Sequence, residues 1–121
     1  MILDGTKIDW HTDRVEAWQK GQRIAPITID MALTRACQYN CGFCYAMLQE
    51  NDRQLITPDV MTRFLDDSAR MGVRSISLVG DGESTLSNAF EHSIRYGDEL
   101  GISMAVGTNA QAINRQKAEK I

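Results

Sequence analysis

Residues Ile27–Cys44 read ITIDMALTRACQYNCGFC, and the rest of the chain can be interpreted outward from this segment. In its first half, large apolar side chains occupy every second position: Ile27, Ile29, Met31 and Leu33. A period of two predicts a β-strand with one strongly apolar face. The second half holds all three cysteines of the 121-residue chain. We therefore expect a strand that runs directly into a cysteine-bearing loop.

The cysteines Cys37, Cys41 and Cys44 have the spacing C-x3-C-x2-C, and no fourth cysteine is present. A [4Fe-4S] cluster held by three thiolates keeps one iron without a protein ligand, whereas electron-transfer ferredoxins use four thiolates. Structural zinc normally takes four protein ligands, and neither His11 nor His92 lies at the usual short spacing from Cys44. A disulfide framework is disfavoured by the odd cysteine count and by the lack of a secretory signal pattern. We expect reduced cysteines in a cytoplasmic protein.

The cysteine loop, with the aromatic Phe43 directly before its last cysteine, resembles the cluster loop of the radical S-adenosylmethionine (radical SAM) superfamily. The flanking residues, Leu33–Ala36 before the loop and Tyr45–Ala46 after it, agree with this resemblance. In that family the open iron of a [4Fe-4S] cluster binds S-adenosylmethionine (SAM), and one electron cleaves SAM to methionine and a 5′-deoxyadenosyl radical. The resemblance implies that the three cysteines are the cluster ligands, and that Phe43 and Tyr45 lie at the adenine side of SAM.

Two further strand and helix units follow the loop. Residues 57–72 begin with a threonine N-cap and a proline and end at a glycine, which predicts a helix. Strands are predicted over 73–79 and 102–106, with a helix capped by Ser87 or Asn88 between them. Strands that alternate with helices of this length indicate right-handed βαβ units and a parallel sheet.

The predicted fold class is therefore α/β, with the first three βα units of a partial TIM-like (β/α) barrel. Residues 1–25 are predicted to form a lead-in segment, and residues 26–121 a partial radical SAM core domain. Three units cannot close a barrel, and they leave the third strand with an unpaired edge. The chain also ends within a helix predicted over 111–121. We expect the chain to be the N-terminal half of a larger core, inactive alone.

The turn Gly80-Asp81-Gly82-Glu83 follows the second predicted strand, and in a parallel sheet reactive groups gather at the carboxyl ends of strands. This turn resembles the Gly-Gly-Glu motif of radical SAM enzymes, which binds the amino group of SAM. Asp81 replaces a common glycine, and Ser84 stands where proline usually follows. The resemblance implies that Gly80, Asp81, Gly82 and Glu83 bind SAM, with Glu83 and Gly82 at its amino group. An ordinary βα turn rich in glycine and aspartate is the alternative.

A third segment, Gly107–Asn109, ends the third predicted strand and resembles the Thr-Asn-Gly of many family members, with Ala110 in the place of glycine. The resemblance implies that Asn109 contacts SAM or substrate. Capping of the following helix by Asn109 is the equal alternative.

The charge and hydropathy of the sequence limit the kinds of partner that we expect. The net charge is −3, and the lysines and arginines are spread along the sequence, so that no nucleic-acid footprint is expected. No apolar run reaches the length of a membrane span. The resemblance implies an oxidoreductase of the class that includes maturases, dehydrogenases and epimerases, with a small-molecule or peptide substrate and an electron donor such as a flavodoxin or ferredoxin. The alternative is a non-catalytic module that binds zinc or an iron-sulfur cluster.

Overall fold

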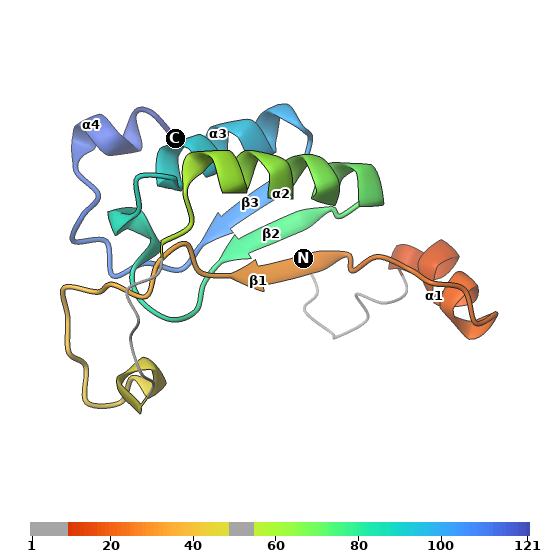
Figure 1. Cartoon of the computed structure of the whole chain (residues 1–121), viewed down its shortest axis with the longest axis horizontal. Coiled ribbons are helices and arrows are strands. Elements are labelled where there is room, and N and C mark those ends of the chain that lie inside the picture. Colours follow the sequence, from red (N-terminus) through yellow and green to blue (C-terminus); the bar gives the residue numbers. More distant parts are fainter. Residues whose placement is uncertain (1–9, 49–54) are drawn as a thin grey trace.

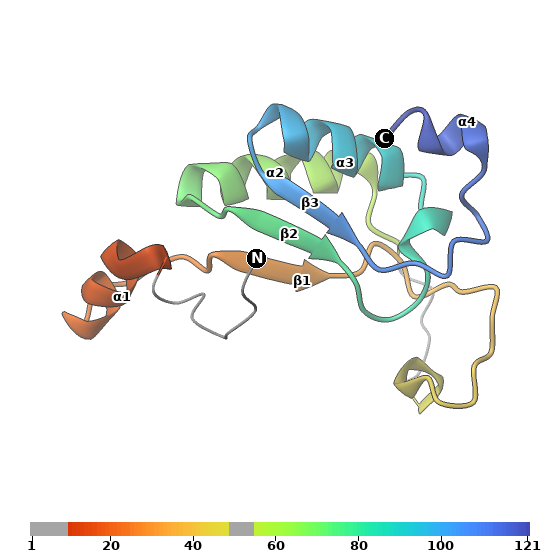
Figure 2. The same cartoon turned by 180° about the vertical axis from the view of Figure 1, so that it is seen from behind.

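The computed structural model describes residues 10–48 and 55–121, and its centre is a parallel three-stranded sheet (Figure 1). The strands are β1 (Thr28–Met31), β2 (Ser75–Leu78) and β3 (Ser103–Val106), in the order β1-β2-β3. Helices α2 (Pro58–Met71) and α3 (Phe90–Glu99) lie on the same face of this sheet, as Figures 1 and 2 show from opposite sides. The α/β prediction, with parallel strands that alternate with helices, is confirmed.

Strand register separates the sheet into an apolar face and a small, polar face. Paired rows on the helix side contain Ile29, Ile76 and Met104, and then Met31, Leu78 and Val106. The intervening rows contain Thr28, Ser75 and Ser103, and then Asp30, Ser77 and Ala105. The core lies between the apolar rows and the two helices, and its fully buried residues include Leu33, Met61, Leu65 and Phe90.

Helix α2 begins and ends at the residues that the sequence indicates. The Thr57 side chain accepts a hydrogen bond from the Val60 N–H at 3.4 Å, and Pro58 is the first helical residue. Gly72 closes the helix in the left-handed region, with φ of 79°. Its neighbour Val73 donates its N–H to the Ser68 carbonyl at 2.9 Å, so that the chain turns directly into β2.

The predicted lead-in segment contains helix α1 (Thr12–Gln19), which lies beyond the amino end of the sheet (Figure 1). Residues 1–9 of this segment are outside the described part of the chain. Arg14 holds α1 in place, because its guanidinium donates to the Ala25 carbonyl at 2.6 Å and also to the Gly72 carbonyl. No residue of α1 is buried.

The helix predicted over 111–121 is wrong in its length, because α4 spans only Arg115–Ala118. Ala110 has φ of 63°, and the Ile113 N–H bonds to its carbonyl at 3.1 Å, so a turn occupies the start of the predicted helix. Asn114 then caps α4 by accepting a hydrogen bond from the Lys117 N–H at 2.8 Å.

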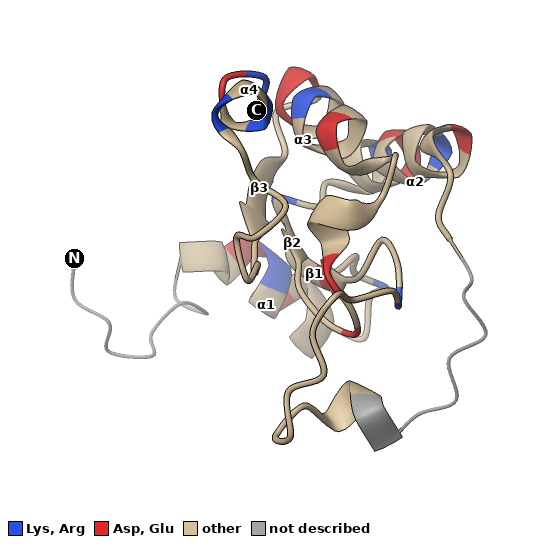
Figure 3. Cartoon of the chain, turned by 90° about the vertical axis from the view of Figure 1, so that its left-hand side faces the viewer, with Lys and Arg blue, Asp and Glu red and all other residues tan. Residues whose placement is uncertain are grey.

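Acidic and basic residues are interspersed along helices α3 and α4 (Figure 3). Within residues 10–48 and 55–121, no helix has both the length and the apolar character needed to cross a membrane.

Candidate functional site

Three loops leave the carboxyl ends of the three strands and lie at the same edge of the sheet (Figure 1). The cysteine loop, residues 32–48, follows β1; the glycine turn, residues 80–86, follows β2; and the asparagine loop, residues 107–114, follows β3. This arrangement follows from the parallel pairing, which directs every strand toward the same edge. All residues predicted to bind cluster or SAM lie in these loops.

Hydrogen bonds join the three loops to one another. The Glu83 N–H donates to the Ala36 carbonyl at 2.8 Å, which ties the glycine turn to the cysteine loop. The Asn109 N–H donates to the Glu83 carboxylate at 2.8 Å, and the Gln38 side-chain amide donates to the Asn109 side-chain oxygen at 3.0 Å. Each loop is therefore bonded to both of the others.

The cysteine loop carries three free thiols, those of Cys37, Cys41 and Cys44. Cys37 is exposed, and the other two are partly exposed. The Cys44 N–H bonds to the Cys41 carbonyl at 3.0 Å, which forms a tight turn between them. The Tyr39 N–H donates to the Cys37 sulfur at 3.4 Å. In the described part of the chain, no three His, Cys, Asp or Glu side chains are grouped so that they could hold a metal ion. Cluster ligation by these cysteines stays a prediction.

The two aromatic residues predicted near adenine project from the cysteine loop. Phe43 is 93% exposed, and Tyr45 is 58% exposed at the start of the 3-10 helix η2 (Tyr45–Leu48). A hydrogen bond to the Asp81 carboxylate and the negative charge of that group raise the pKa of Tyr45. Asp81 also forms an ion pair with Arg35 at 3.6 Å. Asp81 thus connects the glycine turn to both ends of the cysteine loop.

Gly82 packs closely against the backbone of the cysteine loop. It has φ of 83°, and a Cβ atom there would lie 2.8 Å from the Arg35 Cα and closer still to the Thr34 carbonyl oxygen. Gly80 is also in a backbone conformation that side chains rarely adopt, with φ of 150°. The motif resemblance implies that Gly82 lies at the amino group of SAM, and the structure shows that Gly82 lets the turn approach the cysteine loop. Contacts of Gly80 and Gly82 with SAM stay a prediction.

Glu83 is 3% exposed, and its carboxylate accepts hydrogen bonds from three other residues. Its Oε1 atom accepts from the Thr85 N–H at 3.2 Å, from the Thr85 hydroxyl, and from the Thr108 hydroxyl at 2.7 Å. Its Oε2 atom accepts from the Asn109 N–H at 2.8 Å. Burial raises the pKa of Glu83, but the hydrogen bonds from Thr85, Asn109 and Thr108 outweigh it and lower the pKa below its ordinary value. The ionised carboxylate therefore joins the asparagine loop to the glycine turn.

The Asn109 side chain bridges two loops and does not cap a helix. Its Oδ1 atom accepts from the Gln38 amide at 3.0 Å and from the Gln111 N–H at 3.1 Å, and its Nδ2 atom lies 3.9 Å from the Cys37 sulfur. Asn114 caps α4, so the capping alternative for Asn109 is wrong. Its contact with SAM or substrate stays a prediction. Sequence reasoning missed Gln38, because a polar residue within a loop carries no periodic signal.

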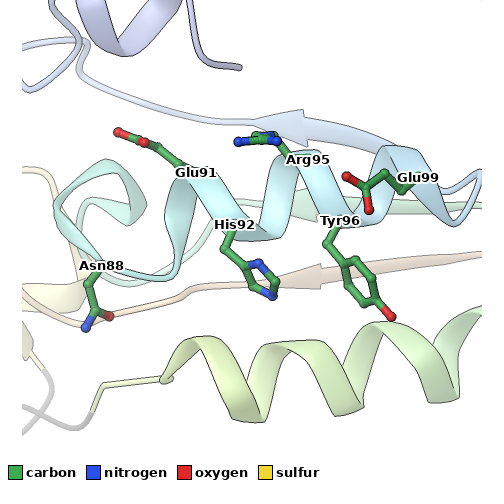
Figure 4. A pocket seen from close by; sticks show the side chains of 6 residues that line it. All are labelled: Asn88, Glu91, His92, Arg95, Tyr96 and Glu99. Atoms are coloured by element: carbon green, nitrogen blue, oxygen red, sulfur yellow. The ribbon is translucent and has the colours of Figure 1, made fainter.

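A second group of polar residues lines a groove along α3, away from the three loops (Figure 4). In this view His92 and Tyr96 point toward α2. The His92 Nε2 atom lies 2.7 Å from the Thr62 hydroxyl, and the Tyr96 hydroxyl donates to the Asp66 carboxylate at 2.7 Å. These contacts join the two helices, so His92 serves packing and does not complete a zinc site with the cysteines.

Comparisons with known proteins agree with this arrangement. The family model for the radical SAM superfamily matches residues 31–121. A curated relative, the S-adenosylmethionine-dependent nucleotide dehydratase of Pseudoalteromonas ulvae, is 25% identical over 81% of this chain and 37% of its own length. The AdoMet-dependent heme synthase of Methanosarcina barkeri is 30% identical over 80% of this chain and 28% of its own length.

Among solved structures, SuiB of Streptococcus suis bound to S-adenosylmethionine superposes with a TM-score of 0.72 at 24% identity. That match covers 88% of this chain and 24% of SuiB, and it shows a common fold. The chain thus spans between about a quarter and two fifths of the length of these three proteins. The family match extends over all three loops, and the chain belongs to the radical SAM superfamily.

Proposed function

We propose that Cys37, Cys41 and Cys44 hold a [4Fe-4S] cluster and that SAM binds beside it at the carboxyl edge of the sheet. The observation that carries this proposal is the placement of three free thiols, with no fourth cysteine in the sequence, on a loop bonded to the glycine turn and the asparagine loop. Three soft thiolate donors suit an iron-sulfur cluster with one open iron. When bound, such a cluster supplies the electron that cleaves SAM to the 5′-deoxyadenosyl radical.

Glu83 is suited to receive the ammonium group of SAM. A carboxylate offers about four lone-pair sites, and Oε2 accepts only one hydrogen bond from the described residues, that of the Asn109 N–H. One acceptor site on Oε2 is thus unused by the described residues. Because its pKa is lowered, the carboxylate stays negative at neutral pH, which favours a cation.

The exposed ring of Phe43 and the ring of Tyr45 offer apolar surface for the adenine of SAM. In their present positions both rings are mostly solvent-exposed, so burial against a ligand would be favourable. Gly80 and Asp81 complete the proposed SAM site on the glycine turn, and the Asn109 side chain, bonded to Gln38, contributes from the asparagine loop.

The protein that contains this chain is proposed to act in the cytoplasm as an oxidoreductase that abstracts hydrogen from a small-molecule or peptide substrate. The breadth of its relatives supports this range, since SuiB has been crystallised with the precursor peptide SuiA and another relative is a nucleotide dehydratase. A flavodoxin or ferredoxin is the proposed electron donor.

Anaerobic reconstitution of the chain with iron and sulfide tests this proposal. We expect about four irons and four sulfides per chain, and an EPR spectrum of the dithionite-reduced protein that changes when SAM is added. Cys41→Ala should lose most of the bound iron, whereas the exposed-residue control Gln111→Ala should retain it. A chain that binds only zinc, or a cluster whose spectrum is indifferent to SAM, would instead support a non-catalytic metal-binding module.

A further inference from the structure

The side chain of Asn109 has one defined orientation, because a backbone N–H, which can only donate, contacts its Oδ1 atom. The Gln38 Nε2 atom lies 3.0 Å from that oxygen, and the Gln111 N–H bonds to it at 3.1 Å. The Gln111 backbone N–H can only donate, so a flipped Asn109 amide would place its NH2 group against that donor and would lose this hydrogen bond. The NH2 group of Asn109 must therefore face the other way, where the Cys37 sulfur lies 3.9 Å from Nδ2.

The backbone of Asn109 is fixed just as firmly. Its N–H bonds to the Glu83 carboxylate at 2.8 Å, and that carboxylate is itself buried and bonded to Thr85 and Thr108. A side chain of the asparagine loop is thus held against the first cysteine of the cysteine loop, 72 residues away in the sequence. Such a contact depends on the fold and does not arise from the cysteine loop alone.

We propose that Asn109 is a positioning residue that donates a hydrogen bond to the Cys37 sulfur and thereby raises the reduction potential of the cluster, with Gln38 as the residue that orients the amide. This inference rests on the proposed function. One-electron reduction adds negative charge that is shared by the cluster and its thiolate sulfurs. A hydrogen-bond donor at a ligand sulfur therefore stabilises the reduced state more than the oxidised state.

The hydrogen-bond donors around the Cys37 sulfur support this role. The Tyr39 N–H already donates to the same sulfur at 3.4 Å, so Cys37 receives donors from its own loop and from the asparagine loop. The Cys37 residue is exposed, so solvent also reaches it. Asn109 supplies a donor whose direction does not depend on solvent, and that difference should be visible in the potential.

The test is an EPR-monitored redox titration of the reconstituted chain, with dithionite as the one-electron reductant and without SAM. Omitting SAM ensures that a shift cannot come from a lost contact between Asn109 and that cofactor. The main variant is Asn109→Leu, which keeps a similar volume and removes both the donor and the acceptor. Gln38→Leu removes the orienting partner only, and Gln111→Ala is the control, because only the backbone of Gln111 contacts Asn109.

We expect Asn109→Leu to retain its iron and to titrate at a more negative potential, with a several-fold lower ratio of reduced to oxidised cluster at a fixed potential. A tenfold lower ratio would correspond to a shift of about 59 mV for one electron. Gln38→Leu should shift in the same direction by less, and Gln111→Ala should not shift.

Equal potentials for the parent and Asn109→Leu would overturn the inference while leaving the cluster assignment intact. Absence of a cluster from the parent chain would overturn the proposed function itself. If Asn109→Leu fails to assemble a cluster, Gln38→Leu decides the matter, since an unshifted potential in that variant overturns the inference and a negative shift supports it.

Discussion

Replacement of Glu83 by glutamine changes the charge of the residue that joins the glycine turn to the asparagine loop, with almost no change in its size. The carboxylate accepts from the Thr85 N–H and hydroxyl and from the Thr108 hydroxyl at one oxygen, and from the Asn109 N–H at the other. A glutamine amide has one oxygen and one NH2 group. If its oxygen keeps the three contacts to the threonines, its NH2 group faces the Asn109 N–H, and two donors then oppose each other.

The magnitude follows from this geometry. Loss of one hydrogen bond to a charged acceptor costs about 1.5 to 3 kcal/mol, and the Asn109 N–H is left without that partner. The remaining contacts become neutral and weaker. Because Glu83 is 3% exposed, water cannot replace the lost acceptor without rearrangement. We expect Glu83→Gln to lower the free energy of unfolding of the ligand-free chain by about 3 kcal/mol.

The pH dependence gives an independent check. The pKa of Glu83 is lowered in the folded chain from its ordinary value of 4.5, so the ionised carboxylate stabilises the fold above that value. This stabilisation is lost as the pH falls through the folded-state pKa, while the neutral glutamine is insensitive. The difference in stability between parent and Glu83→Gln should therefore be constant near neutral pH and should shrink below pH 4.5.

Urea unfolding followed by circular dichroism, without iron or SAM, measures this difference. Glu99→Gln serves as the control, because Glu99 is exposed on α3 and its neutralisation should change the stability little. If Glu83→Gln were as stable as the parent at neutral pH, Glu83 would act only on a ligand. A destabilisation that did not change at low pH would refute the role assigned to the charge.

Positions with a positive φ provide further predictions. Gly82→Ala should destabilise the chain by about 3 kcal/mol, because a Cβ atom there overlaps the backbone of Thr34 and Arg35 and the residue also has a strained φ. The control is Gly101→Ala, which has a similar φ of 74° but open space around it, and it should lower the free energy of unfolding by only about 1 kcal/mol in the same urea titration. Ala110→Gly should stabilise the chain by up to about 1 kcal/mol, since φ of 63° suits glycine, and a lower unfolding midpoint would contradict this account.

Local patterns predicted most of the fold. The alternation of apolar and polar residues over Ile27–Thr34 predicted which face of β1 packs on the helices. The threonine, proline and glycine of residues 57–72 predicted both ends of α2. The prediction failed over 111–121, where helix-forming residues are present but Ala110 adopts a left-handed turn. The 3-10 helix η3 (Ser84–Leu86) was also not predicted, because its cap is the Glu83 side chain, which is bonded to Thr108 of the asparagine loop.

For the site, the sequence predicted which loops meet but not how they are joined. Parallel pairing alone places the cysteine loop, the glycine turn and the asparagine loop at one edge of the sheet. The bonds of Glu83 to Thr108 and of Gln38 to Asn109 join residues 25 and 71 positions apart, and no local spacing encodes them. The motif resemblance assigned Glu83 to a ligand and so overlooked its partners within the chain.

The difference between the two faces of the sheet has a consequence for the order of folding during synthesis. All of the large apolar strand side chains lie on the helix side, and the opposite rows contain small residues such as Ser75, Ser77 and Ala105. The hydrophobic driving force is therefore one-sided, and little free energy is lost while the other face stays hydrated. A nascent chain can bury its core as soon as β3 has left the ribosome, because nothing on the hydrated face has to be covered first.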